Sequence, residues 1–188
     1  YLVTALRSLL RQDMREWEAI VVEACRDPRD VKVVRQQLRE VSDGRVRVFP
    51  YERDDGVFPP FASRKWNFAS RQARGRFIAF LDDDDVKDGD GWLSAMVGPL
   101  LEDSNLATTV CDGTCIDGNG VKSGTVFSDA FLDRGSLLRA RFVTTGQVVV
   151  RREVLDAVGG FDETLGCAED YDFCLRLSAY PWKHVAAA

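Results

Sequence analysis

Four consecutive aspartates, Asp82, Asp83, Asp84 and Asp85, are the residues of this sequence best suited to chemistry. They directly follow the apolar run 77–81, which is typical of a buried strand. In open α/β sheets, ligands bind beyond the carboxyl ends of the strands. Carboxylates held there suit a hard divalent cation that also binds phosphate oxygens. The pattern predicts a metal-bound diphosphate at this strand end, and four solvated acids on a loop are the alternative.

The same segment accounts for the charge of the whole chain. The 188 residues include 25 Lys and Arg against 30 Asp and Glu, a formal net charge of −5. Residues 82–90 contain six Asp and one Lys, so they carry −5 and the rest of the chain is neutral. Proteins that bind nucleic acid by neutralising phosphates show a basic face instead. We therefore expect no nucleic-acid partner.

The cysteines favour reduced thiols over a structural metal. Five Cys occur without a Cys-x-x-Cys pair, and the single His lies far from Cys111 and Cys115 in the sequence. A zinc site needs about four closely spaced ligands. Apolar runs are about five residues long, too short for a membrane span. We expect a cytoplasmic location, or the cytoplasmic face of a membrane reached through segments outside these residues.

Helical and strand-like patterns alternate along the chain, which predicts one α/β domain over residues 1–188. A mainly parallel central sheet flanked by helices is expected, with a small antiparallel hairpin around the turn 117–120. Helices are predicted at 2–14, 28–41, 63–73, 92–101, 132–138, 152–158 and 169–179, strands at 18–22, 45–49, 77–81, 106–111 and 148–150, and a loop at 50–60. Both ends of the domain look cut.

Two classes of enzyme place acids at a strand end in this way. Haloacid-dehalogenase-type phosphatases have Asp-x-Asp-x-Thr/Val after an apolar strand, and residues 82–86 fit that pattern with Asp82 as the nucleophile. That motif normally lies on the first strand, whereas about 80 residues of α/β pattern precede it here. Glycosyltransferases with an Asp-x-Asp motif are the second class.

Further blocks of the sequence favour the second class. The chain resembles the inverting glycosyltransferase family 2, whose members have a GT-A-type nucleotide-diphospho-sugar transferase fold. The resemblance runs in the family's order through nearly the whole chain, in blocks at residues 1–12, 17–22, 67–75, 76–85, 150–163 and 168–177. It implies transfer of a sugar from a nucleotide diphosphate donor, first of all a UDP-sugar, to a hydroxyl of a carbohydrate or lipid-linked acceptor.

The resemblance also implies roles for single residues. Asp84 and Asp82 would coordinate Mn²⁺ or Mg²⁺ at the donor diphosphate, and Asp82 and Asp83 would contact the nucleotide sugar. Asp170 would take the proton of the acceptor hydroxyl, with Glu169 positioning the acceptor. The alternative for the last two is that they are favourable acids in the first turn of a helix.

Departures from the family pattern support a rival interpretation. Where the second strand usually ends in Asp-Asp-Gly-Ser, residues 23–26 are Glu-Ala-Cys-Arg, so Glu23 is the one acid left to contact the nucleotide. The usual first strand is missing before Tyr1, as are segments beyond the last helix. A non-catalytic sugar- or nucleotide-binding relative therefore stays open. Arg64 and Lys65 could meet phosphate, although surface ion pairs are the commoner role.

Overall fold

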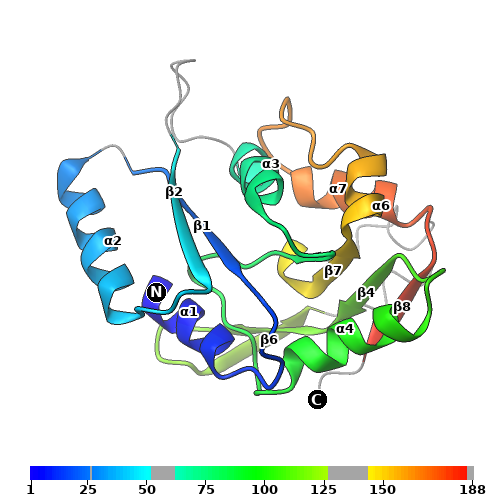
Figure 1. Cartoon of the computed structure of the whole chain (residues 1–188), viewed down its shortest axis with the longest axis horizontal. Coiled ribbons are helices and arrows are strands. Elements are labelled where there is room, and N and C mark those ends of the chain that lie inside the picture. The colour runs from blue at the N-terminus through cyan, green and yellow to red at the C-terminus, as the bar shows by residue number, and fades with distance from the viewer. Residues whose placement is uncertain (26, 52–61, 127–143, 186–188) are drawn as a thin grey trace.

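The structure is a computed structural model that describes residues 1–25, 27–51, 62–126 and 144–185. Helices and strands alternate along the chain, as expected (Figure 1). The elements are α1 (Leu2–Leu10), β1 (Ala19–Glu23), α2 (Pro28–Glu40), β2 (Val46–Pro50), α3 (Ala62–Gln72), β3 (Phe77–Ala79), α4 (Trp92–Glu102), β4 (Thr108–Cys111), β5 (Gly113–Ile116), β6 (Lys122–Val126), the 3₁₀ turn η2 (Thr145–Gln147), β7 (Val148–Arg151), α6 (Arg152–Val158), α7 (Glu169–Leu177) and β8 (Trp182–Val185).

Within the described ranges, the strands form three separate sheets. β1 pairs with β2 in parallel, and β5 pairs with β6 as the expected antiparallel hairpin. The largest sheet has the order β3-β7-β4-β8. In it, β4 and β8 are parallel, whereas β7 runs antiparallel to both of its neighbours. The α/β class is confirmed. The direction of β7 differs from a parallel arrangement because an apolar run fixes a strand but not its polarity.

Local signals explain two of the helix boundaries. Asp27 caps α2 by accepting a hydrogen bond from the backbone N–H of Arg29 at 2.8 Å, and Pro28 occupies the first helical position. α6 ends at Val158, and the glycine that follows it, Gly159, has a φ of 80°, in the left-handed region. β8 was not predicted, because four residues directly after a helix carry little strand signal of their own.

Two predicted elements are shorter than expected: α1 ends at Leu10 instead of residue 14, and β3 ends at Ala79 instead of residue 81. The spacing of Val31, Val34, Leu38 and Val41 predicts a buried stripe on α2, but only Val41, which follows the last helical residue, is buried. The predicted helix at 132–138 and most of the predicted loop at 50–60 lie outside the described residues.

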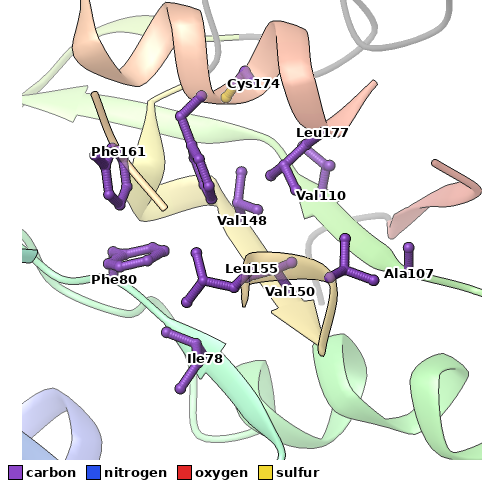
Figure 2. Packing of buried hydrophobic residues seen from close by; sticks show 12 residues of the cluster. Ile78, Phe80, Ala107, Val110, Val148, Val150, Leu155, Phe161, Cys174 and Leu177 are labelled. Carbon is purple, nitrogen blue, oxygen red and sulfur yellow. The ribbon is translucent and has the colours of Figure 1, made fainter. Parts of the chain in front are cut away.

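The main core lies between the four-stranded sheet and the helices α6 and α7. Figure 2 shows Phe80 and Phe161 close together, with Cys174 and Leu177 projecting from α7 towards the same cluster. A second cluster packs α4 against the sheet, through Met96, Val97, Leu100, Leu106, Cys111 and Val149. The two clusters fix the strands that lead to the acidic residues.

A cavity of about 570 Å³ lies between the β1-β2 sheet and the four-stranded sheet. Every residue of β1 and of β3 lines it, together with side chains from α1 and α3. Within the described residues, β1 pairs with β2 alone and β3 with β7 alone, so both are edge strands facing one cavity. The indole N–H of Trp17, which also lines the cavity, is buried without a hydrogen-bond partner in this part of the chain.

Candidate active site

The acidic loop, residues 82–85, lies where the sequence predicted it, just beyond β3. The chain leaves β3 through the buried Phe80 and then turns, with the backbone N–H of Asp85 donating to the carbonyl of Asp82 at 3.1 Å. All four aspartates keep contact with solvent. The strand end therefore presents carboxylates on a turn whose base is anchored in the core.

Electrostatics sets Asp82 apart from its neighbours. The pKa of Asp82 is raised to about 6, mainly by partial burial and then by the nearby carboxylates of Asp85 and Asp84. Burial also raises the pKa of Asp85. Crowded carboxylates repel one another when they are all ionised, and a bound cation relieves that repulsion. The loop is therefore an electrostatically favourable place for a positive ion.

The donor set fits a metal ion that is shared with a ligand. Among the described residues, no group of three or more His, Cys, Asp and Glu side chains is arranged to hold a metal by itself. Mg²⁺ characteristically uses one or two carboxylates plus phosphate oxygens of the substrate. The exposed oxygens of Asp82 and Asp84 can supply such a pair.

Three of the predicted site residues meet at the same cavity. Glu23, Asp82 and Asp83 all line it, and Lys65 of α3 joins them. The pKa of the Cys25 thiol is raised by burial and then by Asp30, Glu23 and Asp83. The end of β1 therefore lies close to the acidic loop. The polar end of the cavity thus combines the end of β1 with the acidic loop. Asp84, Glu169 and Asp170 are not among the lining residues.

The carboxylate of Glu23 is engaged within the protein. Arg35 of α2 donates two hydrogen bonds to it, from Nε to Oε2 and from Nη2 to Oε1, each at 3.2 Å. The side chain of Glu23 is only 7% exposed, whereas that of Arg35 is 61% exposed. A nucleotide that contacts Glu23 would therefore meet an ion pair rather than a free acid.

Asp170 and Glu169 form the first turn of α7, as predicted. Partial burial raises the pKa of Asp170, the nearby Glu169 adds to the effect, and a hydrogen bond of 2.7 Å from the backbone N–H of Tyr171 acts against it. The preceding Ala168 has a φ of 58°, the one positive φ of a non-glycine residue within the described segments. Such a conformation persists only where the surroundings impose it. A raised pKa suits a carboxylate that accepts protons.

An aromatic cluster connects the acidic loop to α7. Phe80 lies two residues before Asp82, and Phe173 lies three residues after Asp170. Their ring centroids are 6.0 Å apart, and Phe161 contacts both rings at 5.1 and 4.2 Å. The two groups of acids are therefore attached to one rigid core, although they come from distant parts of the sequence.

Asn67 ties α3 to the segment that follows α6. Its Nδ2 donates to the carbonyl of Phe161 and to Oε1 of Glu163, and its Oδ1 accepts from the backbone N–H of Phe161, all at 2.9 Å. Gly160 has a φ of 68°, and a Cβ there would lie 2.5 Å from Asn67 Oδ1. Sequence reasoning missed this arrangement. Two features of the sequence could have indicated it. Asn67 is a polar residue inside an amphipathic helix, and Gly160 is a second glycine although Gly159 alone is enough to end α6.

The cationic candidates of α3 take different positions. Arg64 donates from Nε to the backbone carbonyl of Glu163 at 3.3 Å and lies 4.0 Å from that carboxylate. This is the ion-pairing role that the sequence favoured. Lys65 instead lines the cavity and lowers the pKa of Asp82, although burial, Asp85 and Asp84 each have a larger effect in the opposite direction.

Comparison with known proteins identifies the class. The fold matches that of TarS from S. aureus, with a TM-score of 0.72 and 21% identity over 100% of this chain and 33% of TarS. It also matches the mannosyltransferase PcManGT from Pyrobaculum calidifontis, solved with GDP-Man and Mn²⁺, with a TM-score of 0.63 and 16% identity over 98% of this chain and 52% of that protein. The fold is thus the GT-A fold of glycosyltransferases.

Sequence comparison then gives the family. The sequence model of glycosyl transferase family 2 matches residues 1–159, and the chain belongs to this family. The O-antigen biosynthesis protein RfbC of Myxococcus xanthus is 28% identical over 179 residues, which are 95% of this chain and 13% of RfbC. The pre-mycofactocin glycosyltransferase of Mycobacterium tuberculosis is 29% identical over 108 residues, 54% of this chain and 23% of that protein. The chain therefore spans a minor part of these relatives. None of the helices in the described segments combines the length and apolar character that a membrane crossing requires.

Proposed function

We propose that this domain is an inverting glycosyltransferase that moves a sugar from a nucleotide diphosphate donor to an acceptor hydroxyl with the help of Mn²⁺ or Mg²⁺. One observation carries the proposal. A family 2 chain presents a run of carboxylates, with the pKa of Asp82 raised to about 6, at the polar end of a cavity beside a strand end. Strand ends of this kind are where α/β sheets bind their ligands.

The residues of the acidic loop divide the work of donor binding. Asp84 and Asp82 would hold the metal ion, and Asp83 with Glu23 would contact the nucleotide. A divalent cation bound there offsets the charge of the departing diphosphate. The Mn²⁺ bound with GDP-Man in the similar mannosyltransferase supports this choice of ion. Lys65, at the same end of the cavity, is placed to approach a phosphate.

The rest of the cavity suits a different occupant. Its walls away from the acids are largely apolar, two edge strands run along it, and the indole N–H of Trp17 lacks an acceptor within the described residues. We propose that a strand outside residues 1–188 pairs with both β1 and β3 and completes the domain. Amides of β1 should then exchange their hydrogens more slowly in the natural-length protein than in the 188-residue chain. Equal exchange rates would contradict this.

Asp170 is our candidate for the base. Its raised pKa favours proton uptake, and its place at the start of α7, next to the conformationally constrained Ala168, fixes its backbone. Removal of a proton from the acceptor hydroxyl makes the oxygen a better nucleophile towards the anomeric carbon, which inverts the configuration there. Glu169 would orient the acceptor.

The relatives support a class of acceptor and a location. RfbC is named as an O-antigen biosynthesis protein. We propose a carbohydrate or lipid-linked acceptor, handled in the cytoplasm or at the cytoplasmic face of a membrane to which other segments attach the protein.

The test combines donor binding with transfer. The natural-length protein is screened by thermal shift against UDP- and GDP-sugars with and without Mn²⁺, and transfer is measured with the donor that stabilises it. Asp170→Asn should abolish transfer and leave Mn²⁺-dependent donor binding intact, whereas Asp84→Asn should abolish both. Asp156→Asn on α6 and Asp88→Asn near the loop, both exposed acids, are the matched controls.

The outcomes separate the enzyme from its rival. Donor binding without transfer to any acceptor, unaffected by Asp170→Asn, would indicate a non-catalytic binding relative. If no nucleotide sugar stabilises the protein with or without Mn²⁺, the proposed function is wrong.

A further inference from the structure

Lys87 is a buried cation directly behind the acidic loop. Its residue is only 4% exposed. The ammonium Nζ donates to the carbonyls of Phe80 at 3.1 Å and of Gly146 at 2.5 Å, and it lies 4.3 Å from the centroid of the Trp92 ring. A buried ammonium without such partners would be strongly unfavourable. The ammonium group of Lys87 therefore has favourable partners at this position, namely two backbone carbonyls and an aromatic ring.

These contacts close the acidic loop at both ends. Phe80 precedes the loop and Lys87 follows it, so the hydrogen bond between them joins the two ends across residues 82–85. The backbone N–H of Lys87 donates to Oγ of Ser8 in α1 at 3.0 Å. The second acceptor, Gly146, belongs to η2. The loop is thus held between α1, the end of β3 and η2 by one residue.

The charge of Lys87 faces the same carboxylates. Burial lowers the pKa of Lys87 to about 8, while Cys111, Asp85 and Asp82 act in the opposite direction. Asp85 packs close by, because a Cβ on Gly146 would lie 3.1 Å from its Oδ2 and 3.9 Å from Lys87 Nζ. A buried positive charge therefore sits beneath the loop that is proposed to bind a cation.

We propose that Lys87 is a positioning residue that fixes the acidic loop in the geometry needed to bind a divalent cation with the donor diphosphate. The metal-binding part of this inference rests on the proposed function. No other residue of the described chain links both ends of the loop to η2 through a single side chain.

Two physical effects of Lys87 predict opposite results, and this makes the role testable. As a charge, Lys87 repels a cation, so its removal should tighten metal binding. As a clamp, it holds the ligands in place, and loss of such support typically weakens metal binding by about 10–100-fold. We expect the clamp to dominate, with weaker binding in spite of the lost repulsion.

The experiment compares three variants of the natural-length protein. Lys87→Met removes the charge and the donors, Lys87→Gln removes the charge and keeps an N–H₂ donor, and Lys65→Met removes a charge near Asp82. The dissociation constant of Mn²⁺ is measured by electron paramagnetic resonance, with and without the nucleoside diphosphate of the donor. Hydrogen exchange of the amides at 80–90 is followed by mass spectrometry.

We expect Mn²⁺ to bind at least about tenfold more weakly to Lys87→Met. Lys87→Gln should lie between Lys87→Met and the wild type both in Mn²⁺ affinity and in the exchange rate at 80–90. Without the nucleoside diphosphate, Lys65→Met should bind Mn²⁺ as tightly as the wild type or more tightly, and its exchange at 80–90 should be unchanged. The proposal is overturned if Lys87→Met binds Mn²⁺ as well as the wild type does, or if exchange at 80–90 is unchanged.

Two further outcomes are also decisive. If both Lys87 variants fail to fold, Ser8→Ala tests the anchoring of the same residue, because it removes the hydroxyl that accepts from the backbone N–H of Lys87 while every charge stays. Unchanged Mn²⁺ affinity together with unchanged exchange at 80–90 in that variant would refute the proposal. If the wild type binds no Mn²⁺ but loop exchange still accelerates in Lys87→Met, the clamp stands and the proposed function fails.

Discussion

The contact between Gly160 and Asn67 gives the sharpest stability prediction. Gly159 and Gly160 both have positive φ, of 80° and 68°, so an alanine at either position costs about 1–2 kcal/mol of backbone strain. A Cβ on Gly159 meets no atom within 4 Å, whereas one on Gly160 would lie 2.5 Å from Asn67 Oδ1. Gly159→Ala is therefore a matched control that carries the strain without the collision.

The size of the extra effect follows from the hydrogen bonds of Asn67. This buried side chain makes three hydrogen bonds of 2.9 Å, two with the backbone of Phe161 and one with Glu163. Each contributes about 0.5–1.5 kcal/mol, so displacing Asn67 should cost about 2–3 kcal/mol beyond the strain. We expect Gly160→Ala to lower the free energy of unfolding by about 3–5 kcal/mol.

Urea unfolding followed by circular dichroism measures both costs. In an Asn67→Ala background, Gly160→Ala should cost only about as much as Gly159→Ala does, because the blocking oxygen is absent. If the two glycine substitutions cost the same in the wild type, or if the cost of Gly160→Ala is independent of Asn67, the reasoning is wrong.

Three other predictions concern charge and burial. Because the pKa of Asp82 is raised to about 6, its carboxylate takes up a proton as the pH falls from about 7 to 5, and this proton competes with the metal ion. Mn²⁺ should therefore bind about tenfold more weakly at pH 5 than at pH 7 by calorimetry, and Asp82→Asn should remove that dependence. Arg176 donates hydrogen bonds to two backbone carbonyls at the end of α6. Arg176→Met should therefore lower the free energy of unfolding, measured by urea denaturation, by about 2–3 kcal/mol. A decrease below about 0.5 kcal/mol would contradict this. Iodoacetamide should modify the exposed Cys115 and Cys167 within minutes and the buried Cys174 only after unfolding, as mass spectrometry of the peptides will show; rapid labelling of Cys174 would refute its burial.

The sequence was sufficient where the signal is local. The start of α2 at Pro28, the end of α6 at Val158 and the start of β3 at Phe77 each depend on signals within a few residues, and each lies where it was predicted. The order of the family blocks then gave the GT-A fold, which the comparisons confirm.

Long-range features could not be predicted in the same way. The antiparallel direction of β7 and the pairing of β8 with β4 depend on partners that are distant in sequence. Lysine is rarely buried in proteins. Nothing near Lys87 in the sequence indicates that its ammonium group donates hydrogen bonds to the backbone carbonyls of Phe80 and Gly146. The ion pair of Glu23 with Arg35 joins β1 to α2, and the expectation of a nucleotide contact at Glu23 stays a prediction.

The cavity separates β1, β2 and α2 from the four-stranded sheet, and this separation affects the affinity for a donor. β1, β2 and α2 contain no fully buried residue in their described ranges, so they form the part of the protein that should open most readily on its own. Glu23 and Asp83 lie on opposite sides of that division, at the end of the cavity where the donor is proposed to bind. A nucleotide that contacts both must hold the weakly attached part closed. Part of its binding free energy would then be consumed in local folding, and the measured affinity for the donor would report on the stability of β1 and β2 as well as on the contacts with the ligand.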